Sequence, residues 1–239
     1  MSFKIVVMSC DKNEDLWLPY HLCMEKYWQN HPEIIYCTET KTNQWYKTIH
    51  TNYPIEKWTK RVYDTIKDLE CDKVILMVDD IFLRDYVDDF LVETISELVG
   101  GVIGGLNFER QFDNNDIPLS DFISIRNPQG KWKTSVMCQL WNKKALLDIF
   151  NCEKDPWTFE RENNSKGYIF LISKYGNFLN WGYGERKWFG IRKGKWCKEC
   201  KDFFDKENIK IDYSIRGFYE WKFMYVHWRK TNIYISMNG

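Results

Sequence analysis

The feature of this sequence that most constrains the fold is an apolar run that ends in two adjacent carboxylates. The run spans residues 73–78 and is followed at once by Asp79 and Asp80. A short continuous apolar run of this kind is typical of a strand buried on both faces of a parallel sheet. The two acids then lie at its carboxyl end, the edge where open α/β sheets bind ligands. Such a pair can hold a divalent cation, or it can form a solvated turn.

Strand and helix patterns alternate before this run. Residues 3–8 and 33–37 read as strands, while apolar side chains recur at helical spacing in residues 16–28 and 54–69. This alternation favours parallel βαβ units with right-handed crossovers. The predicted fold class is therefore α/β: one Rossmann-like domain in which helices flank a mostly parallel central sheet.

Beyond the acids, a helix is predicted over residues 84–99 with Phe90, Ile95 and Leu98 facing inward, and a strand over 102–106. Further patterns predict a polar connection, a strand and a short helix at 107–131, 133–140 and 142–150. No repeat and no Pro/Gly/Ser-rich linker marks a boundary. We expect a single domain over 1–239, with a nucleotide-binding half of about 1–106 and an acceptor and catalytic half of about 107–239.

The charge balance and the short apolar run at the start of the sequence restrict the class of protein. Lys plus Arg equals Asp plus Glu, at 34 each, whereas a nucleic-acid binder would show a basic excess. The apolar run at the start of the chain is too short for a secretion signal or a membrane span. These observations predict a cytoplasmic protein that binds no nucleic acid and has at most peripheral membrane contact. Cys197 and Cys200 have metal-like spacing, but no second pair of similar spacing completes a zinc site.

The chain is rich in aromatic residues, which make up 17% of it and include 12 Trp. A core of this size does not need so many, so we expect some of these side chains to be exposed. Exposed aromatic rings can stack on sugar rings, or they can form an interface with another protein.

Four segments, taken in their order along the chain, resemble one known family. They are Ser9–Lys12 with Asp15–Trp17, then Trp58–Arg61, Val78–Leu83 and Asp155–Glu160. Together they resemble GT-A-fold glycosyltransferases of bacterial capsule and lipopolysaccharide biosynthesis, and the related domain of giant-virus glycosyltransferases. The resemblance covers most of residues 3–200. It implies a transferase with a nucleotide-sugar donor such as a UDP-sugar, and an oligosaccharide or lipid-linked glycan as acceptor.

The resemblance also implies roles for residues on the donor side. Ser9 and Asp11 would contact the nucleoside, while Trp58 and Arg61 would approach the base and the phosphate. From the residues alone, Ser9 to Asp11 could equally be a helix cap, Trp58 a core residue and Arg61 part of a surface ion pair.

The same likeness makes Asp80 a ligand of a divalent metal, manganese or magnesium, and Asp79 a partner of the ribose or the metal. Val78 occupies the first acidic position of the family's D-x-D motif, a departure that puts the metal dependence in question. His227, near the C-terminus, would complete the metal shell by resemblance, or it is an ordinary histidine in an aromatic stretch.

Glu160 is the candidate general base. It lies beside Trp157 and Phe159, and burial near aromatic rings raises a carboxyl pKa, which suits a group that accepts a proton from an alcohol. The alternative is that Glu160 begins a solvated charge run. Three further acids could take the base role: Asp113, Asp116 and Asp155.

Lys195 lies in a glycine-centred basic loop, residues 191–196, that also resembles a feature of the family. Lysine and arginine on a flexible loop can close over a leaving diphosphate as its charge develops.

The leading hypothesis is a metal-assisted, inverting glycosyltransferase. A non-catalytic carbohydrate-binding domain of the same fold is the first alternative, and a nucleotidyltransferase is the second. Against the latter, the first strand is followed by Ser9 to Lys12 and not by the glycine-rich loop that would cradle a triphosphate.

Overall fold

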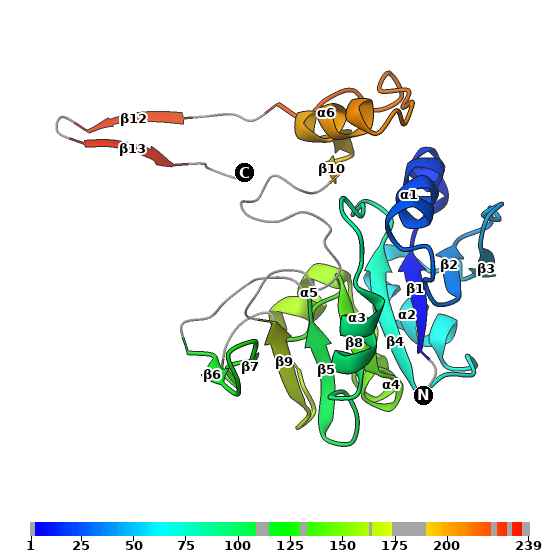
Figure 1. The fold of residues 1–239 in the computed structure, drawn as a ribbon, viewed down its shortest axis with the longest axis vertical. Helices are drawn as coiled ribbons and strands as arrows, with labels where there is room; N and C mark the ends of the chain where they lie inside the picture. Colours follow the sequence, from blue (N-terminus) through cyan, green and yellow to red (C-terminus); the bar gives the residue numbers. More distant parts are fainter. Residues whose placement is uncertain are drawn as a thin grey trace. The chain divides into compact units, whose positions relative to one another are not determined.

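The computed structural model divides into two compact units, Met1–Arg186 and Lys187–Gly239 (Figure 1), and each is described here by itself. The structure describes residues 3–108, 115–129, 133–162, 164–173, 190–220, 224–228 and 231–235, the last two ranges as backbone only. The expected single domain over 1–239, with halves that meet near residue 106, stays a prediction; strands from both sides of that residue share one sheet.

The first unit is built on a sheet of nine described strands in the order β3-β2-β1-β4-β8-β5-β9-β7-β6. In chain order they are β1 (Phe3–Met8), β2 (Ile34–Thr38), β3 (Lys47–His50), β4 (Lys73–Val78), β5 (Ile103–Asn107), β6 (Ile117–Pro118), β7 (Ile123–Ile125), β8 (Gln139–Asn142) and β9 (Ile169–Ser173). β1 pairs in parallel with both β2 and β4, and β5 with β9. β8 runs antiparallel between β4 and β5. The predicted α/β class with a mostly parallel sheet is confirmed.

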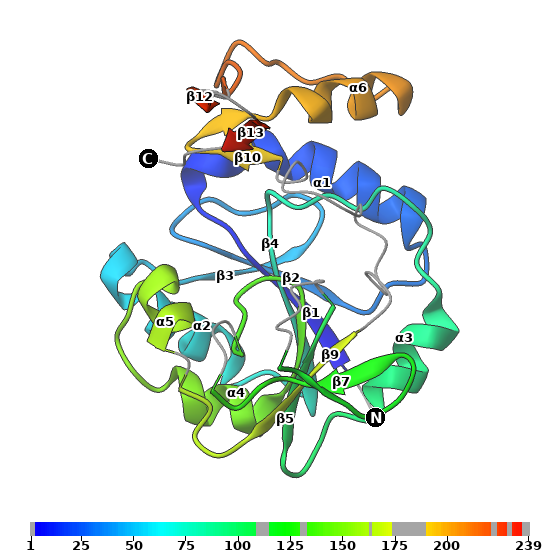
Figure 2. The same ribbon diagram turned by 90° about the vertical axis from the view of Figure 1, so that its left-hand side faces the viewer.

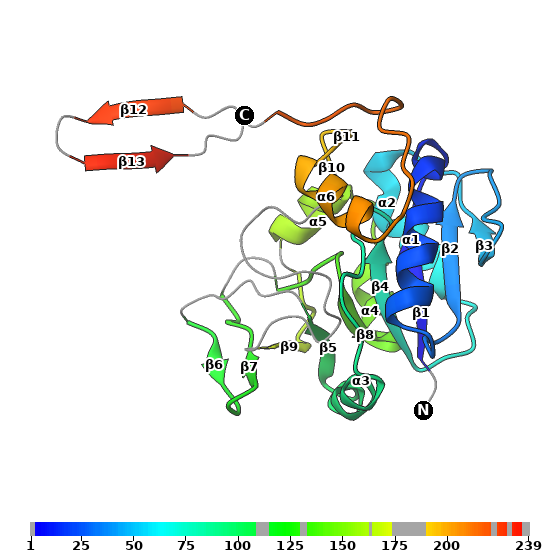
Figure 3. The same cartoon turned by 45° about the horizontal axis from the view of Figure 1, so that its top comes forward.

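Helices cover both faces of this sheet (Figures 2 and 3). They are α1 (Glu14–Tyr27), α2 (Trp58–Ile66), α3 (Asp89–Ser96), α4 (Lys143–Phe150) and α5 (Pro156–Glu162), with short 3-10 turns η1 (Asp11–Asn13) and η2 (Ile55–Lys57) before α1 and α2. Side chains of α2, α4 and α5 share one hydrophobic cluster with Val6 of β1, Leu76 of β4 and Trp141 of β8. On the opposite face, Tyr20 of α1 contacts Met77 of β4. Because helices cover both faces of the sheet, every residue of β1 and β4 is apolar except Lys4 and Lys73 near their amino ends.

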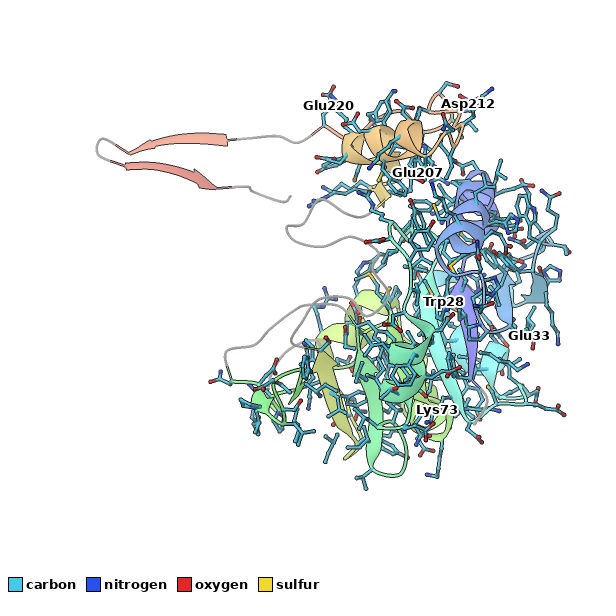
Figure 4. The ribbon with its side chains drawn as sticks, in the orientation of Figure 1. Trp28, Glu33, Lys73, Glu207, Asp212 and Glu220 are labelled. Carbon is cyan, nitrogen blue, oxygen red and sulfur yellow. The ribbon has the colours of Figure 1, made fainter. Side chains whose placement is uncertain are left out.

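Two hydrogen bonds attach α3 to the sheet and to α1, and Figure 4 labels their donors, Lys73 and Trp28. Lys73 begins β4, and its buried ammonium group donates to the carbonyl of Ser96, the last residue of α3. The indole of Trp28, just after α1, donates to Asp89 in the first turn of α3. α3 is therefore fastened both to the amino end of β4 and to α1.

Two expectations of element position are wrong. The helix predicted over 84–99 begins only at its cap Asp88, whose carboxylate accepts the Leu91 N–H at 2.9 Å, and this start leaves Phe90 76% and Leu98 43% exposed. Ile95 faces inward as predicted, and Val92 is buried as well. The strand predicted over 133–140 is reduced to β8, because the preceding segment turns at Cys138, where φ is 49°.

The second unit has its own small core, in which Trp196 contacts Phe204 and Tyr213 edge to face. Its elements are the β10 (Ile191–Arg192) and β11 (Lys195–Trp196) hairpin, α6 (Lys198–Lys206), and the β12 (Met224–Trp228) and β13 (Thr231–Ile235) hairpin. Lys193 and Gly194 both have positive φ, the conformation that a two-residue hairpin turn requires. Within the part of the chain that the structure describes, no helix combines the length and the apolar composition needed to cross a membrane.

Gly105 of β5 provides a test of the sheet's packing. A Cβ there would lie 2.7 Å from the Leu140 carbonyl oxygen and 2.8 Å from Gln139 Nε2, so Gly105→Ala forces the β5–β8 pair apart. Overpacking of this kind costs about 1–3 kcal/mol in the free energy of unfolding, measured by urea denaturation.

Gly100 is the matched control, because a Cβ at this position meets no atom within 4 Å. Gly100→Ala should leave the urea midpoint unchanged or raise it slightly. Equal midpoints for the two variants would contradict the close β5–β8 packing.

Candidate functional site

The strand order places a topological switch point between β1 and β4. The chain leaves β1 toward β2 on one side and later adds β4 on the other, so the loops after β1 and β4 separate at the carboxyl edge of the sheet (Figure 1). Open α/β sheets bind ligands in the crevice at such a point. Ser9 follows β1 and Asp79 follows β4, so these sequence-predicted residues lie at the switch point, one on each of the two strands.

Asp79 joins the two sides. Its carboxylate accepts hydrogen bonds from the Ser9 hydroxyl and, at 3.1 Å, from the Asn13 amide. The indole Nε1 of Trp17 donates in turn to Ser9 Oγ at 2.8 Å. Asp79 is only 3% exposed, and a carboxylate so buried requires donors of this kind. Its predicted role toward ribose or metal stays a prediction, while its contacts hold the loop after β1 against the end of β4.

Asp80 is the more accessible of the two acids, at intermediate exposure. Among the described residues, no group of three or more His, Cys, Asp and Glu side chains is placed to hold a metal. Magnesium, however, is commonly bound through one or two carboxylates together with substrate phosphates and water. The acids present therefore fit a cation that shares its ligands with a diphosphate, and Asp80 is the side chain that would hold it.

The thiol of Cys10 lies near several charged side chains at this edge. Cys10, beside Ser9, is half-buried, and burial raises its thiol pKa to about 11, assisted by the nearby charges of Asp79 and Glu39. The thiol is thus protonated near neutral pH. Lys12 and Arg61 act on the thiol in the opposite direction, so charges of both signs lie near this part of the site.

Asp11 binds the loop that follows β2. Its carboxylate accepts the N–H groups of Glu39, Thr40 and Lys41 at 3.1–3.2 Å and the Thr40 hydroxyl. Burial alone would raise the pKa of the Asp11 carboxyl, but these hydrogen bonds outweigh burial and hold the pKa below its usual range. The predicted contact of Asp11 with a nucleoside stays a prediction; the contacts of the carboxylate shape the loop that begins with Glu39.

Arg61 and Glu39 form an ion pair that the sequence analysis did not identify. Arg61 Nη1 lies 2.9 Å from Glu39 Oε1, and the same guanidinium donates to Thr51 Oγ1 at 3.0 Å and to the Cys37 carbonyl at 3.3 Å. Arg61 is 5% exposed, so it does not belong to a surface ion pair. Its predicted approach to a phosphate is untested, and three of its nitrogens already have partners in the protein.

Glu39 could have been found by the rule that identified Asp79. It directly follows β2 at the carboxyl edge of the sheet, with its carboxylate partly exposed.

Trp58 is 7% exposed and packs against Phe150 at a ring-centroid distance of 6.2 Å. The core interpretation of Trp58 therefore agrees with its surroundings.

Glu160 lies on α5 and reaches the segment that leads into β8. Its Oε1 accepts the Val136 N–H at 2.9 Å and the Ser135 hydroxyl at 3.3 Å. Glu160 is 8% exposed, so it is not part of a solvated charge run. Burial raises the pKa of its carboxyl, although both hydrogen bonds act in the opposite direction.

The register of β8 places Glu160's partners at the same edge as Asp79. Gln139, the first residue of β8, pairs with Leu76 of β4 in antiparallel register, so residues that precede Gln139 extend toward the end of β4. The Phe108 N–H also donates to the Cys138 carbonyl, which ties this segment to the end of β5. The fold thus brings Glu160 and the acids after β4 to one edge of the sheet.

The other sequence-predicted residues are distributed differently. Asp155 caps α5 by accepting the Thr158 N–H at 2.8 Å, and hydrogen bonds from Thr158 lower its carboxyl pKa. Asp116 accepts the Asn127 N–H at 2.7 Å, and Asp113 lies outside the described residues. Lys195 is exposed on the hairpin of the second unit, and His227 is described only as backbone within β12.

Comparisons with known proteins were made by sequence and by structure. No protein-family model and no curated protein sequence matches the chain. Among solved structures, S. aureus TarS 1-349 in complex with UDP is similar with a TM-score of 0.50 and 14% identity, over 74% of this chain and 59% of that one. Another structure of S. aureus TarS is similar with a TM-score of 0.50 and 12% identity, over 74% of this chain and 36% of that one.

Two more distant similarities have lower scores. A cytidylyltransferase from Leptospira borgpetersenii has a TM-score of 0.45 and 11% identity, over 90% of this chain and 97% of that one. The galactosyltransferase LgtC in complex with donor and acceptor sugar analogs has a TM-score of 0.39 and 13% identity, over 61% and 59% of the two chains. At these identities the comparisons address the fold alone. The chain has the Rossmann-like α/β fold of the GT-A-like glycosyltransferase TarS.

Proposed function

We propose that this protein is a glycosyltransferase that moves a sugar from a uridine or deoxythymidine diphosphate sugar to a hydroxyl of a glycan acceptor, with inversion and with the help of a divalent cation. One observation carries the proposal: Asp79, joined to Ser9 across the switch point of the sheet, with the more accessible Asp80 beside it. The fold shared with TarS supports it, and TarS 1-349 has been crystallised with UDP and with UDP-GlcNAc.

On the donor side, hydrogen bonds within the protein hold the loops at the carboxyl edge of the sheet in place. Asp79, Ser9 and Asn13 fix the floor between β1 and β4, while Asp11 fixes the loop that carries Glu39. Asp80 would hold manganese or magnesium together with diphosphate oxygens. When bound, the cation would neutralise the negative charge that grows on the leaving diphosphate.

On the acceptor side, Glu160 takes the proton. The acceptor oxygen forms a bond to the anomeric carbon as its proton passes to the Glu160 carboxylate, and the bond between that carbon and the diphosphate oxygen breaks with its electron pair leaving on the diphosphate. A raised carboxyl pKa makes Glu160 a better proton acceptor than an exposed glutamate. The Val136 N–H fixes the orientation of this carboxylate.

A second function is favoured by one specific observation. Asp79 and Glu160 are both buried and hydrogen-bonded within the protein, as acids with a purely structural role would be. A carbohydrate-binding domain of the same fold without catalytic activity would have these features too. The acceptor proposed here is an oligosaccharide or lipid-linked glycan, as in capsule or lipopolysaccharide synthesis, and the two functions differ in whether that glycan is extended or only bound.

The cation role of Asp80 can be measured by calorimetry. UDP should bind the wild-type protein more tightly with manganese or magnesium than with EDTA, because the cation links the diphosphate to the protein. Asp80→Ala should abolish this difference while leaving the metal-independent part of binding intact. The lost contact corresponds to about 1.5–3 kcal/mol, the typical value of a hydrogen bond or contact to a charged group.

Asp72→Ala is the matched control, since Asp72 is an exposed aspartate just before the opposite end of the same strand. It should bind UDP as the wild type does, with and without metal. If Asp80→Ala keeps the full metal effect, Asp80 does not hold the cation.

Glu160→Gln decides between transferase and binding domain. Glutamine keeps the shape and the acceptor oxygen for Val136 but cannot take a proton, so sugar transfer should fall about 10²–10⁴-fold. UDP affinity should change little, because the residue acts on the acceptor side. The exposed Glu162 lies on the same helix as Glu160 and pairs with Lys154, which precedes the helix, so Glu162→Gln is the control and should keep wild-type transfer.

The pH profile gives a second measurement of the same role. Transfer requires ionised Glu160, and burial raises its pKa above the ordinary 4.5, so the rate should fall as the pH drops through this raised value. Glu160→Gln should lack this acid limb. A variant that transfers sugar at the wild-type rate would assign the base to another acid, and a wild-type protein that binds glycans but transfers no sugar would support the binding domain.

A further inference from the structure

Trp157 on α5 presents a large aromatic ring to solvent, with 61% of its surface exposed. The other tryptophans whose side chains the structure describes are buried or half-buried. They are Trp17, Trp28, Trp45, Trp58, Trp141 and Trp196. An indole exposed to water gains free energy when an apolar surface covers it. Its exposure therefore favours a ligand that covers it.

Helix geometry places this ring next to the candidate base. Phe159 fixes the inner face of α5, because its ring packs against Phe150 with 4.3 Å between centroids. Trp157 and Glu160 are three residues apart, a spacing that puts their Cβ atoms about 5–6 Å from each other on a helix. Arg161 lies four residues after Trp157 on the same side, is exposed, and donates to Thr158 Oγ1 at 3.1 Å.

The chemistry of these neighbours points to a sugar ring. The C–H groups on the apolar face of a pyranose pack against the negative face of an aromatic ring, while its hydroxyls need donors and acceptors at the edge. The Arg161 guanidinium carries several N–H donors that can serve those hydroxyls. We propose that Trp157 is the platform on which the acceptor's terminal pyranose stacks, with its reacting hydroxyl directed to Glu160; this inference rests on the proposed transferase function.

The surroundings of Trp157 disfavour a protein partner. A stable protein interface buries about 800 Å² on each side, with an apolar core. Around Trp157 the helix and the loop before it carry charged side chains, among them the Lys154–Glu162 and Lys57–Glu153 ion pairs. A single aromatic ring within a charged surface is the size of one sugar residue, not of a protein interface.

The test uses small sugars as probes, so it does not depend on the natural acceptor. Methyl glycosides of glucose, galactose, mannose, N-acetylglucosamine and rhamnose are each mixed with the full chain, and saturation-transfer NMR detects which ring protons contact the protein. At least one glycoside should show transfer to its ring C–H protons with the wild type and with Trp157→Phe. Trp157→Ala should reduce that signal at least tenfold.

Phe90→Ala is the matched control, because Phe90 is an aromatic residue of similar exposure on α3, on the opposite side of the sheet from α5 (Figure 2). It should keep the glycoside signal. The platform is refuted if Trp157→Ala keeps the signal, if the wild type binds no glycoside, or if Trp157→Ala lowers the melting temperature by several degrees, which would indicate a packing role.

Calorimetry with UDP on the same samples separates this inference from the proposed function. Normal UDP binding by Trp157→Ala together with a lost glycoside signal supports both. A wild type that binds glycosides through Trp157 but does not bind UDP would overturn the transferase function while the sugar platform stands. UDP binding together with a Trp157-independent glycoside signal would overturn the platform alone.

Discussion

The candidate site depends on one buried carboxylate, Asp79, which holds the loop after β1 to the end of β4. Its partners Ser9 and Asn13 come from more than sixty positions away in the sequence, so these bonds form only when β1 and β4 pair in their observed register. Removing the carboxylate would take away the acceptor of both hydrogen bonds, and losing one partner of a buried hydrogen bond costs about 1–3 kcal/mol. The geometry of the crevice and the stability of the sheet's carboxyl edge therefore have the same origin.

A second set of charges supports the first. Asp11 accepts three backbone N–H groups of the loop after β2, and Glu39 from that loop pairs with the buried Arg61 of α2. Buried charges are stable only when they are paired and hydrogen-bonded, so this arrangement ties β1, β2 and α2 together beside the crevice. Asp80 is more exposed than Asp79, and the proposed function assigns contact with the ligand to this more accessible acid.

Local patterns predicted some of these features and could not predict others. β1 and β4 occur over the predicted residues, because a strand buried on both faces has an unambiguous apolar run. The Arg61–Glu39 pair was missed because it joins residues from different elements. The prediction that Phe90 faces inward was wrong, and the helix begins later than predicted, after its cap Asp88. The segment before β8 looks extended in sequence, yet it bends at Cys138 and delivers the Val136 N–H to Glu160. Such contacts are decided by tertiary packing, which periodicity does not record.

The most direct test of the account is an NMR titration that follows the Trp17 indole N–H, which donates to Ser9 Oγ at the floor of the crevice. Its signal can be assigned by its loss in Trp17→Phe. If a nucleoside diphosphate binds between β1 and β4, the Trp17 signal should shift progressively as UDP is added with magnesium, while the signal of Trp141, buried in the cluster beneath α2 and α4, stays in place. Saturation of the protein with UDP, shown by calorimetry on the same sample, without any movement of the Trp17 signal would contradict the assignment of the site.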